Sequence, residues 1–206
     1  PERELKWKFS INKSLMKAHL NLDNTKKAIL YGERAIKNAE KIRMYPLAQG
    51  LRVECGELYY QVGDKLKSLN CFYQALNNWD GELPMEYEPL AYFGIARVHF
   101  EQLSYEDAEK SFKEALKRLP SFKLKAQILQ YLGYIELENK DYLKALEYFS
   151  ASLALNEKLE KSDRLGKNYQ SIGLVYNEIG KLKKAEEFFM LSLELDRKGN
   201  NKEQVA

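Results

Sequence analysis

The stretch YQSIGLVYNEIG, residues 169–180, raises the question that decides the fold, because it places a glycine inside a segment that otherwise favours a helix. Glycine in a helix interior costs about 1 kcal/mol relative to alanine. The larger residues around it recur with the spacing of one helix face, at i, i+3, i+4 and i+7: Tyr169, Ile172, Gly173 and Tyr176. Gly173 therefore lies on the face that should pack against a neighbour, and the reason for it must be sought elsewhere in the chain.

The same arrangement occurs five times along the chain. The positions equivalent to Gly173 follow one another at spacings of 40, 37, 40 and 40 residues: Gly133, Ala96, Gly56 and Met16. Each copy continues into a second apolar stripe, which in the last copy follows a short break at residues 178–180. Because so short a break makes two helices antiparallel neighbours, the sequence predicts five helical pairs.

The small residues have a packing explanation in this arrangement. At the crossing of two helices a small side chain lets the backbones approach closely. Each of the last four copies places a phenylalanine in its second stripe, which we expect to fill space near the small residue: Phe72, Phe112, Phe149 and Phe189.

The pattern Y-x2-I-G-x2-Y followed by A-x3-F, at Tyr169–Phe189, resembles the motif of the tetratricopeptide repeat. The resemblance implies an all-α fold, an α-solenoid of about five antiparallel helix pairs that coil into a right-handed superhelix. The spacing resembles a subclass with repeats of about 40 residues. We expect one array over residues 1–206, with repeats at about 8–44, 45–84, 85–121, 122–161 and 162–200. Residues 201–206 then begin a further repeat or a tail, so that the chain is expected to be part of a longer protein.

The resemblance also implies a function, because the first helix of each pair in this family lines a concave groove that binds a peptide or another protein. Helical geometry selects the residues beside the packing stripe as the groove surface. The candidates are Lys17, Glu57, Tyr60, Phe93, Arg97, Phe100, Tyr131, Tyr134 and Asn177. Arginine and exposed aromatic residues are typical of interface hot spots. For Phe93 and Phe100, packing against neighbouring repeats remains the alternative.

We therefore expect a protein or peptide interaction module within a larger regulatory or scaffold protein. The alternative is a peptide-sensing regulatory domain of a bacterial signalling protein, such as a sensor kinase, a phosphatase or a transcription regulator, that switches an output domain. An exposed aromatic groove can also bind a neighbouring copy, so that self-association is part of the expectation.

Other functions have little support in the sequence. We find no phosphate-binding loop and no hydrolase or metalloprotease motif, and we expect no catalytic residues, no cofactor and no metal. His19 and His99 occupy packing positions two repeats apart, and Cys55 and Cys71 are expected to be buried thiols. The basic residues are too dispersed to predict nucleic-acid binding, and no apolar run predicts membrane insertion. The two cysteines favour a reducing, cytoplasmic setting.

Overall fold

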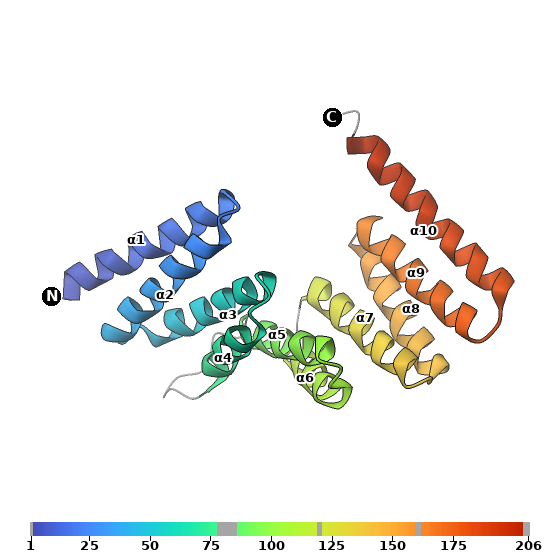
Figure 1. Ribbon diagram of the computed structural model, residues 1–206, viewed down its shortest axis with the longest axis horizontal. Helices are drawn as coiled ribbons and strands as arrows, with labels where there is room; N and C mark the ends of the chain where they lie inside the picture. Colours follow the sequence, from blue (N-terminus) through green and yellow to red (C-terminus); the bar gives the residue numbers. More distant parts are fainter. Residues whose placement is uncertain (1, 78–85, 119–120, 160–161, 204–206) are drawn as a thin grey trace. The chain divides into compact units, whose positions relative to one another are not determined.

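The computed structural model describes residues 2–77, 86–118, 121–159 and 162–203, and every regular element within these ranges is an α-helix. The ten helices in this part of the chain are α1 (Glu2–Asn21), α2 (Thr25–Lys41), α3 (Tyr45–Gln61), α4 (Lys65–Leu76), α5 (Glu88–Glu101), α6 (Tyr105–Lys117), α7 (Phe122–Glu138), α8 (Tyr142–Lys158), α9 (Ser162–Glu178) and α10 (Leu182–Glu203). They are arranged as antiparallel pairs (Figure 1), which confirms the predicted all-α solenoid.

The helices belong to two compact units, which are described separately. The first unit, Pro1–Leu119, contains α1 to α6, and the second, Pro120–Ala206, contains α7 to α10. Within each unit every helix packs against the next one in the chain. The right-handed superhelix over all five pairs stays a prediction. Residues 204–206, in the expected tail, lie outside the described residues.

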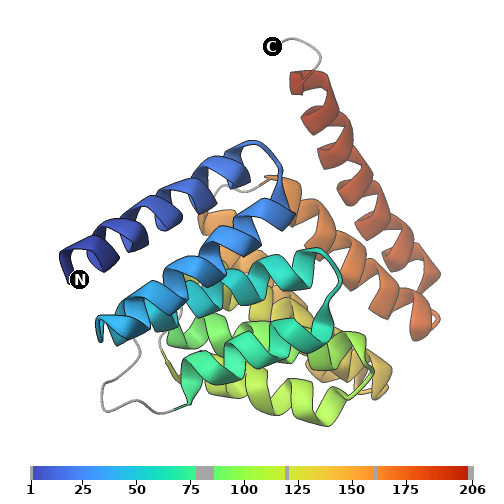
Figure 2. The ribbon, with the colours of Figure 1, turned by 60° about the vertical axis from the view of Figure 1, so that its left-hand side comes forward.

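Tight turns with one left-handed residue close the helix pairs. Gly63 follows α3 at φ 80° and Gly180 follows α9 at φ 73°, a backbone conformation that glycine adopts without penalty. The other three pairs use larger residues at φ 52–62°: Asp23, Leu103 and Lys140. In Figures 1 and 2 the three turns of the first unit lie along the same side of that unit.

Leu103 has a left-handed backbone conformation, which is unfavourable for leucine. Its side chain contributes little packing energy to offset this cost, because 71% of it is exposed. We expect Leu103→Gly to raise the free energy of unfolding by about 0.5–1 kcal/mol, since glycine removes the steric cost of this backbone. Urea denaturation followed by circular dichroism measures the change. The matched reverse variant is Gly63→Ala, because a Cβ there would meet nothing within 4 Å, and it should lose a similar amount. Equal stability of Leu103→Gly and the parent would contradict the strain argument.

The glycines of the repeated motif are explained by aromatic rings. A Cβ added to Gly56 would lie 2.8 Å from the ring of Phe72, and one added to Gly133 would lie 2.5 Å from the ring of Phe149. The nearest atoms in each case are ring carbons, which confirms the expectation that the phenylalanine fills the space beside the small residue. The glycine leaves room for the phenylalanine of the second helix, whose ring is fully buried.

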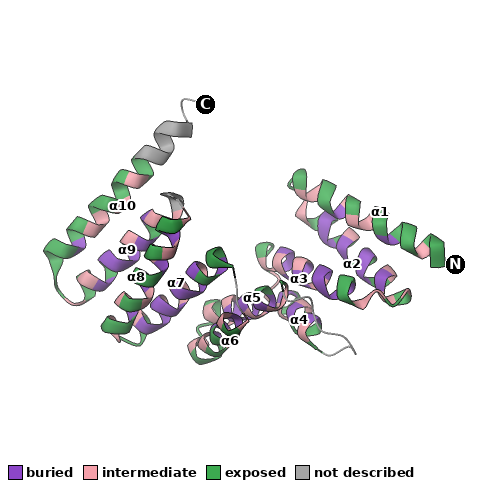
Figure 3. Cartoon of the chain, turned by 180° about the vertical axis from the view of Figure 1, so that it is seen from behind, coloured by how far each residue is buried: buried purple, intermediate pink, exposed green. Residues whose placement is uncertain are grey.

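Burial follows the predicted stripes. In Figure 3 the buried residues lie on the facing sides of paired helices, while the outer sides are exposed. The core of the first unit includes Met16, Leu51 and Cys55, and the core of the second includes Phe149 and Val175. The side chains beside these stripes, on the first helix of each pair, are the ones predicted to contact a partner.

Candidate partner-binding surface

The nine predicted groove residues are divided between the two units. The first unit contains Lys17, Glu57, Tyr60, Phe93, Arg97 and Phe100, and the second contains Tyr131, Tyr134 and Asn177. Lys17 and Asn177 are exposed on α1 and α9, and Tyr131 is half-buried on α7. The structure brings four of them together around Arg97, whereas the hydrogen-bond partners of Tyr134 lie outside these nine residues.

Arg97 is the centre of the group in the first unit, which we call the Arg97 cluster (Glu57, Tyr60, Phe93, Arg97 and Glu101). Its guanidinium forms an ion pair with Glu57 and lies 4.0 Å from the ring centroid of Tyr60. The ring of Phe93 is on another side, at 4.9 Å. Only 12% of the Arg97 side chain is exposed, so these contacts are partly shielded from water.

Two neighbouring first helices position this cluster. Glu57 and Tyr60 are three residues apart on α3, and Arg97 and Glu101 are four residues apart on α5, so each pair shares one helix face. The Tyr60 hydroxyl donates a hydrogen bond to Glu101, and the two helices are thereby linked a second time. The cluster is a polar and aromatic bridge between consecutive repeats.

Glu101 is held in its charged form by its neighbours. Burial raises the pKa of Glu101, but hydrogen bonds from Lys65 and Tyr60 lower it, as do the charges of Lys65 and Arg97. Lys65 Nζ lies 2.8 Å from Glu101 Oε2. The net effect places the pKa of Glu101 below its ordinary value. The surface therefore presents fixed positive and negative charges side by side at neutral pH.

The two phenylalanines of the prediction differ from each other. Phe93 is only 6% exposed and packs against Phe112, with ring centroids 5.9 Å apart, so its packing alternative describes it and its expected place on the groove surface is corrected. Phe100 is half-buried and lies 5.5 Å from the ring of Tyr105. Arg97 therefore lies over a buried phenylalanine ring, Phe93, whereas part of Phe100 is exposed to solvent.

Tyr134 belongs to a buried polar network in the second unit. Its hydroxyl lies 2.7 Å from the hydroxyl of Ser171, and Gln130 donates a hydrogen bond to the same Ser171 oxygen at 2.8 Å. Gln130 also accepts from Asn168 at 2.7 Å. Asn168 in turn accepts from Asn156 of α8 at 2.7 Å. The network therefore joins α7, α8 and α9.

Sequence reasoning missed the centre of this network. Asn168 is fully buried, although it directly precedes the packing residue Tyr169 and was not assigned a role. The available signal was a polar residue next to an apolar stripe, directly after a copy whose second helix also has polar residues at inward positions, Ser152 and Asn156. Buried polar groups require hydrogen-bond partners, so that such residues are expected to find one another.

Chemically reactive groups are few in the part of the chain that the structure describes. No group of three histidine, cysteine or acidic side chains there could hold a metal ion. Burial raises the pKa of the Cys55 thiol well above its usual range and that of Cys71 to about 11, so both thiols stay protonated at neutral pH. Nor does any helix within the described ranges have the length and apolar character needed to cross a membrane.

Comparison with known proteins finds a family whose models match this chain. Two family models described as tetratricopeptide repeat match residues 53–121 and 124–198, together more than half of the chain. No curated protein matches the sequence.

Several solved structures share the fold at low sequence identity. The apo form of RapI is 18% identical with a TM-score of 0.75, and the match covers 93% of this chain and 54% of that one. A MamA structure from Desulfovibrio magneticus RS-1 is 16% identical with a TM-score of 0.69, covering 93% and 96%. BtubC from P. vanneervenii is 16% identical with a TM-score of 0.64, covering 95% and 92%.

Proposed function

The chain belongs to the tetratricopeptide repeat family, and on this premise we propose that it binds a segment of a partner protein or a peptide on the first-helix face around Arg97. The observation that supports the proposal most directly is the Arg97 cluster itself. A partly shielded arginine between aromatic rings is the kind of group that dominates binding energy when a partner completes its burial. We propose binding, without catalysis, as part of a larger regulatory or scaffold protein.

The surface around the cluster offers apolar contact as well as charge. Leu90 lies on the same helix as Arg97 and is 41% exposed, and Tyr60 and Phe100 are half-buried. A partner segment would gain by covering these side chains, since removing apolar surface from water is favourable. The fixed charges of Glu57 and Glu101 then favour partners that present polar groups in matching positions.

A peptide-sensing regulatory domain is the second candidate, and the network around Tyr134 favours it. Gln130 and Tyr134 lie on the predicted groove stripe of α7, and both are hydrogen-bonded to Ser171 of the next repeat. A ligand that took over either hydrogen bond would change the contact between α7 and α9. For this second function we propose Tyr131, Tyr134 and Asn177 as the residues of the second unit that contact the peptide. We also propose that all five helix pairs form one array.

The test uses a displayed peptide library selected against the full chain, with affinities measured by fluorescence polarisation. We expect Arg97→Ala to weaken a selected peptide at least about tenfold, because loss of a hot-spot arginine costs about 2 kcal/mol. The matched control is Arg118→Ala. The Arg118 guanidinium also lies over an aromatic ring, 4.2 Å from the Tyr92 centroid, and also pairs with carboxylates, but it caps the second helix α6.

The two variants separate binding from stability. Both remove a stacked, ion-paired arginine from the first unit, so both should lose similar folding stability. Only Arg97→Ala should lose the peptide, and Arg118→Ala should stay within about twofold of the parent, as expected for a residue outside the interface. Equal losses of peptide affinity in the two variants, or unchanged affinity in Arg97→Ala, would show that the face around Arg97 is not the binding site.

A further inference from the structure

A pocket of about 250 Å³ opens in the second unit, where the first helices α7 and α9 both end. Six residues line it: Leu137, Glu138, Lys140, Tyr142, Leu174 and Glu178. Leu137 follows Tyr134 by three residues on α7, so the pocket continues the first-helix face on which Tyr134 lies. It therefore adjoins a residue that we propose above to contact a peptide.

The first unit has an equivalent carboxylate, Glu101, which already has a cationic partner. Glu101 and Glu178 each lie five residues after the repeated small residue of their copy. Lys65 Nζ is 2.8 Å from Glu101 Oε2, and the Tyr60 hydroxyl donates a hydrogen bond to the same carboxylate. The charge of Arg97 also stabilises its ionised form. A carboxylate at this position of the repeat thus binds an ammonium group where the chain supplies one.

At Glu178 the chain supplies none of these three partners. The equivalent positions have one aromatic and two aliphatic side chains, and all of them line the pocket: Tyr142 for Lys65, Leu137 for Tyr60 and Leu174 for Arg97. Because leucine is smaller than tyrosine or arginine, the replacements leave space beside the carboxylate as well as removing its donors. Neither Glu178 nor Glu138 has an ion-pair partner among the described residues.

The backbone around the pocket also favours a cation. Glu138 is the last residue of α7 and Glu178 is the last residue of α9. Both carboxylates therefore lie at helix C-termini, where the helix dipole adds negative potential. The N-terminus of α8, which would add positive potential, is capped by the side chain of Asp141.

Lysines of the adjoining turns do not neutralise these carboxylates. Lys144 pairs with Asp141 at 2.7 Å. Lys140, at the rim, and Lys181, three residues beyond Glu178, are exposed and form no ion pair among the residues that the structure describes. A cation from a ligand would therefore meet carboxylates that have no ion-pair partner in the protein.

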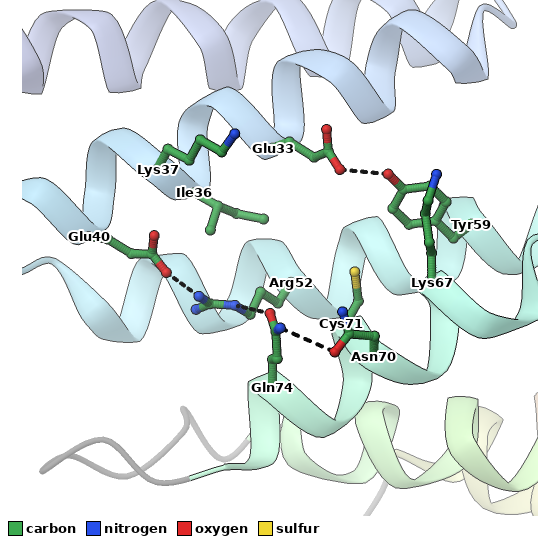
Figure 4. Close-up of a pocket in the computed structure, with 10 residues that line it drawn as sticks. All are labelled: Glu33, Ile36, Lys37, Glu40, Arg52, Tyr59, Lys67, Asn70, Cys71 and Gln74. Atoms are coloured by element: carbon green, nitrogen blue, oxygen red, sulfur yellow. Dashed lines mark hydrogen bonds and ion pairs between the residues drawn. The ribbon is translucent and has the colours of Figure 1, made fainter.

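A larger pocket in the first unit differs in this respect. It has a volume of about 370 Å³ and lies between α2 and α4, with α3 at its base (Figure 4). Arg52 pairs there with Glu40, and Figure 4 shows the Glu33 carboxylate between Lys37 and Lys67. Because positive and negative groups alternate around that pocket, they favour neither charge in a ligand.

We propose that the pocket at the ends of α7 and α9 binds a lysine side chain of the partner segment. The aliphatic part of the lysine lies against Leu137, Leu174 and the ring of Tyr142. Its ammonium group pairs with Glu178 and Glu138. The inference rests on the function proposed above, since the lysine belongs to the bound segment, and it adds that this segment has a basic residue.

The probes are four capped tripeptides, acetyl-Ala-X-Ala-amide, in which X is lysine, Nε-acetyl-lysine, norleucine or glutamate. Binding to the full chain is followed by two-dimensional amide NMR. We expect the lysine peptide to bind about threefold to fivefold more tightly than the two neutral peptides, as for exposed ion pairs, and the glutamate peptide to bind most weakly. Equal affinities of the lysine and norleucine peptides would describe a purely apolar site and overturn the proposal.

Glu178→Gln tests the assignment, because it keeps the shape of the side chain and removes its charge. The preference for lysine over norleucine should fall to about twofold or less, since one of the two carboxylates is lost. The matched control is Glu157→Gln, which removes another exposed carboxylate from the last turn of a helix, α8, and does not line the pocket. An unchanged preference in Glu178→Gln, or an equal reduction in Glu157→Gln, would contradict the assignment.

Tyr142→Lys gives a second test, because it reproduces the arrangement of the first unit. Lys65 and Tyr142 each directly follow the aspartate that caps the second helix, so a lysine fits this position of the repeat. The new ammonium group should pair with Glu178 as Lys65 pairs with Glu101, and the lysine peptide should lose its preference to about twofold or less. Full retention of the preference in this variant would also overturn the proposal.

This proposal and the one for the Arg97 face fail separately, since Arg97 belongs to the first unit. If a library peptide depends on Arg97 but the tripeptides show no preference for lysine, the lysine site is wrong and the proposed function stands. If the tripeptides show the preference and no library peptide depends on Arg97, the lysine site stands and the face around Arg97 is not the binding site.

Discussion

Replacing Phe72 with alanine is expected to lower the free energy of unfolding by about 3–5 kcal/mol. The ring is 1% exposed and fills a space between three helices. A Cβ added to Gly56 of α3 would lie 2.8 Å from this ring, and one added to Gly94 of α5 would lie 2.2 Å from it. Because glycines form two walls of the space, neither of these walls has a side chain that could move into the void. The loss should therefore reach the upper part of the range.

Urea denaturation of the full chain measures this loss, and Phe122→Ala is the matched control. Phe122 is the first residue of α7. Because 67% of it is exposed, its truncation should change the free energy of unfolding by less than about 0.5 kcal/mol. If Phe72→Ala lost no more than Phe122→Ala, the ring could not be what holds α3, α4 and α5 together.

Asn168→Leu is expected to cost about 2–4 kcal/mol, although leucine has the same branched shape and the same number of side-chain heavy atoms. The Asn168 amide donates to Gln130 at 2.7 Å and to Ser152 at 2.9 Å, and its carbonyl oxygen accepts from Asn156 at 2.7 Å. Leucine would leave these groups buried without their partner. Each unsatisfied group of this kind costs about 1–3 kcal/mol, and partial rearrangement of the network reduces the sum.

The control lies on the same helix. Asn177→Leu makes the same chemical change at an exposed position of α9 and should stay within about 0.5 kcal/mol of the parent. Hydrogen exchange gives a further readout, since Asn168→Leu should reduce amide protection in α7 and α8, where the bonded partners lie. If Asn168→Leu were as stable as the parent, the hydrogen-bond network would make no net contribution to the free energy of unfolding.

The predicted groove residues show how much of the candidate site could be predicted from the sequence. Glu57 and Arg97 occupy the same position in consecutive copies, so the repeat placed both on the first-helix face. Their ion pair, and the place of Arg97 over the Tyr60 ring, depend on the distance between α3 and α5. Phe93 has the same local pattern as an exposed groove residue, yet the ring of Phe112 covers it. Local spacing selects a face but does not fix which side chains on it stay exposed.

By itself the sequence determined the five helix pairs, the turn at Gly180 and the face on which each apolar stripe lies. These features are encoded within single helices, where a period of 3.6 residues and the conformational freedom of glycine act over a few neighbouring residues. Only the tertiary structure decided that the Phe72 ring is shared by Gly56 and Gly94, that Asn168 joins three helices, and that a pocket opens between α2 and α4. Those contacts depend on how side chains about 12 to 40 residues apart fill a common volume, and close packing makes that choice collectively.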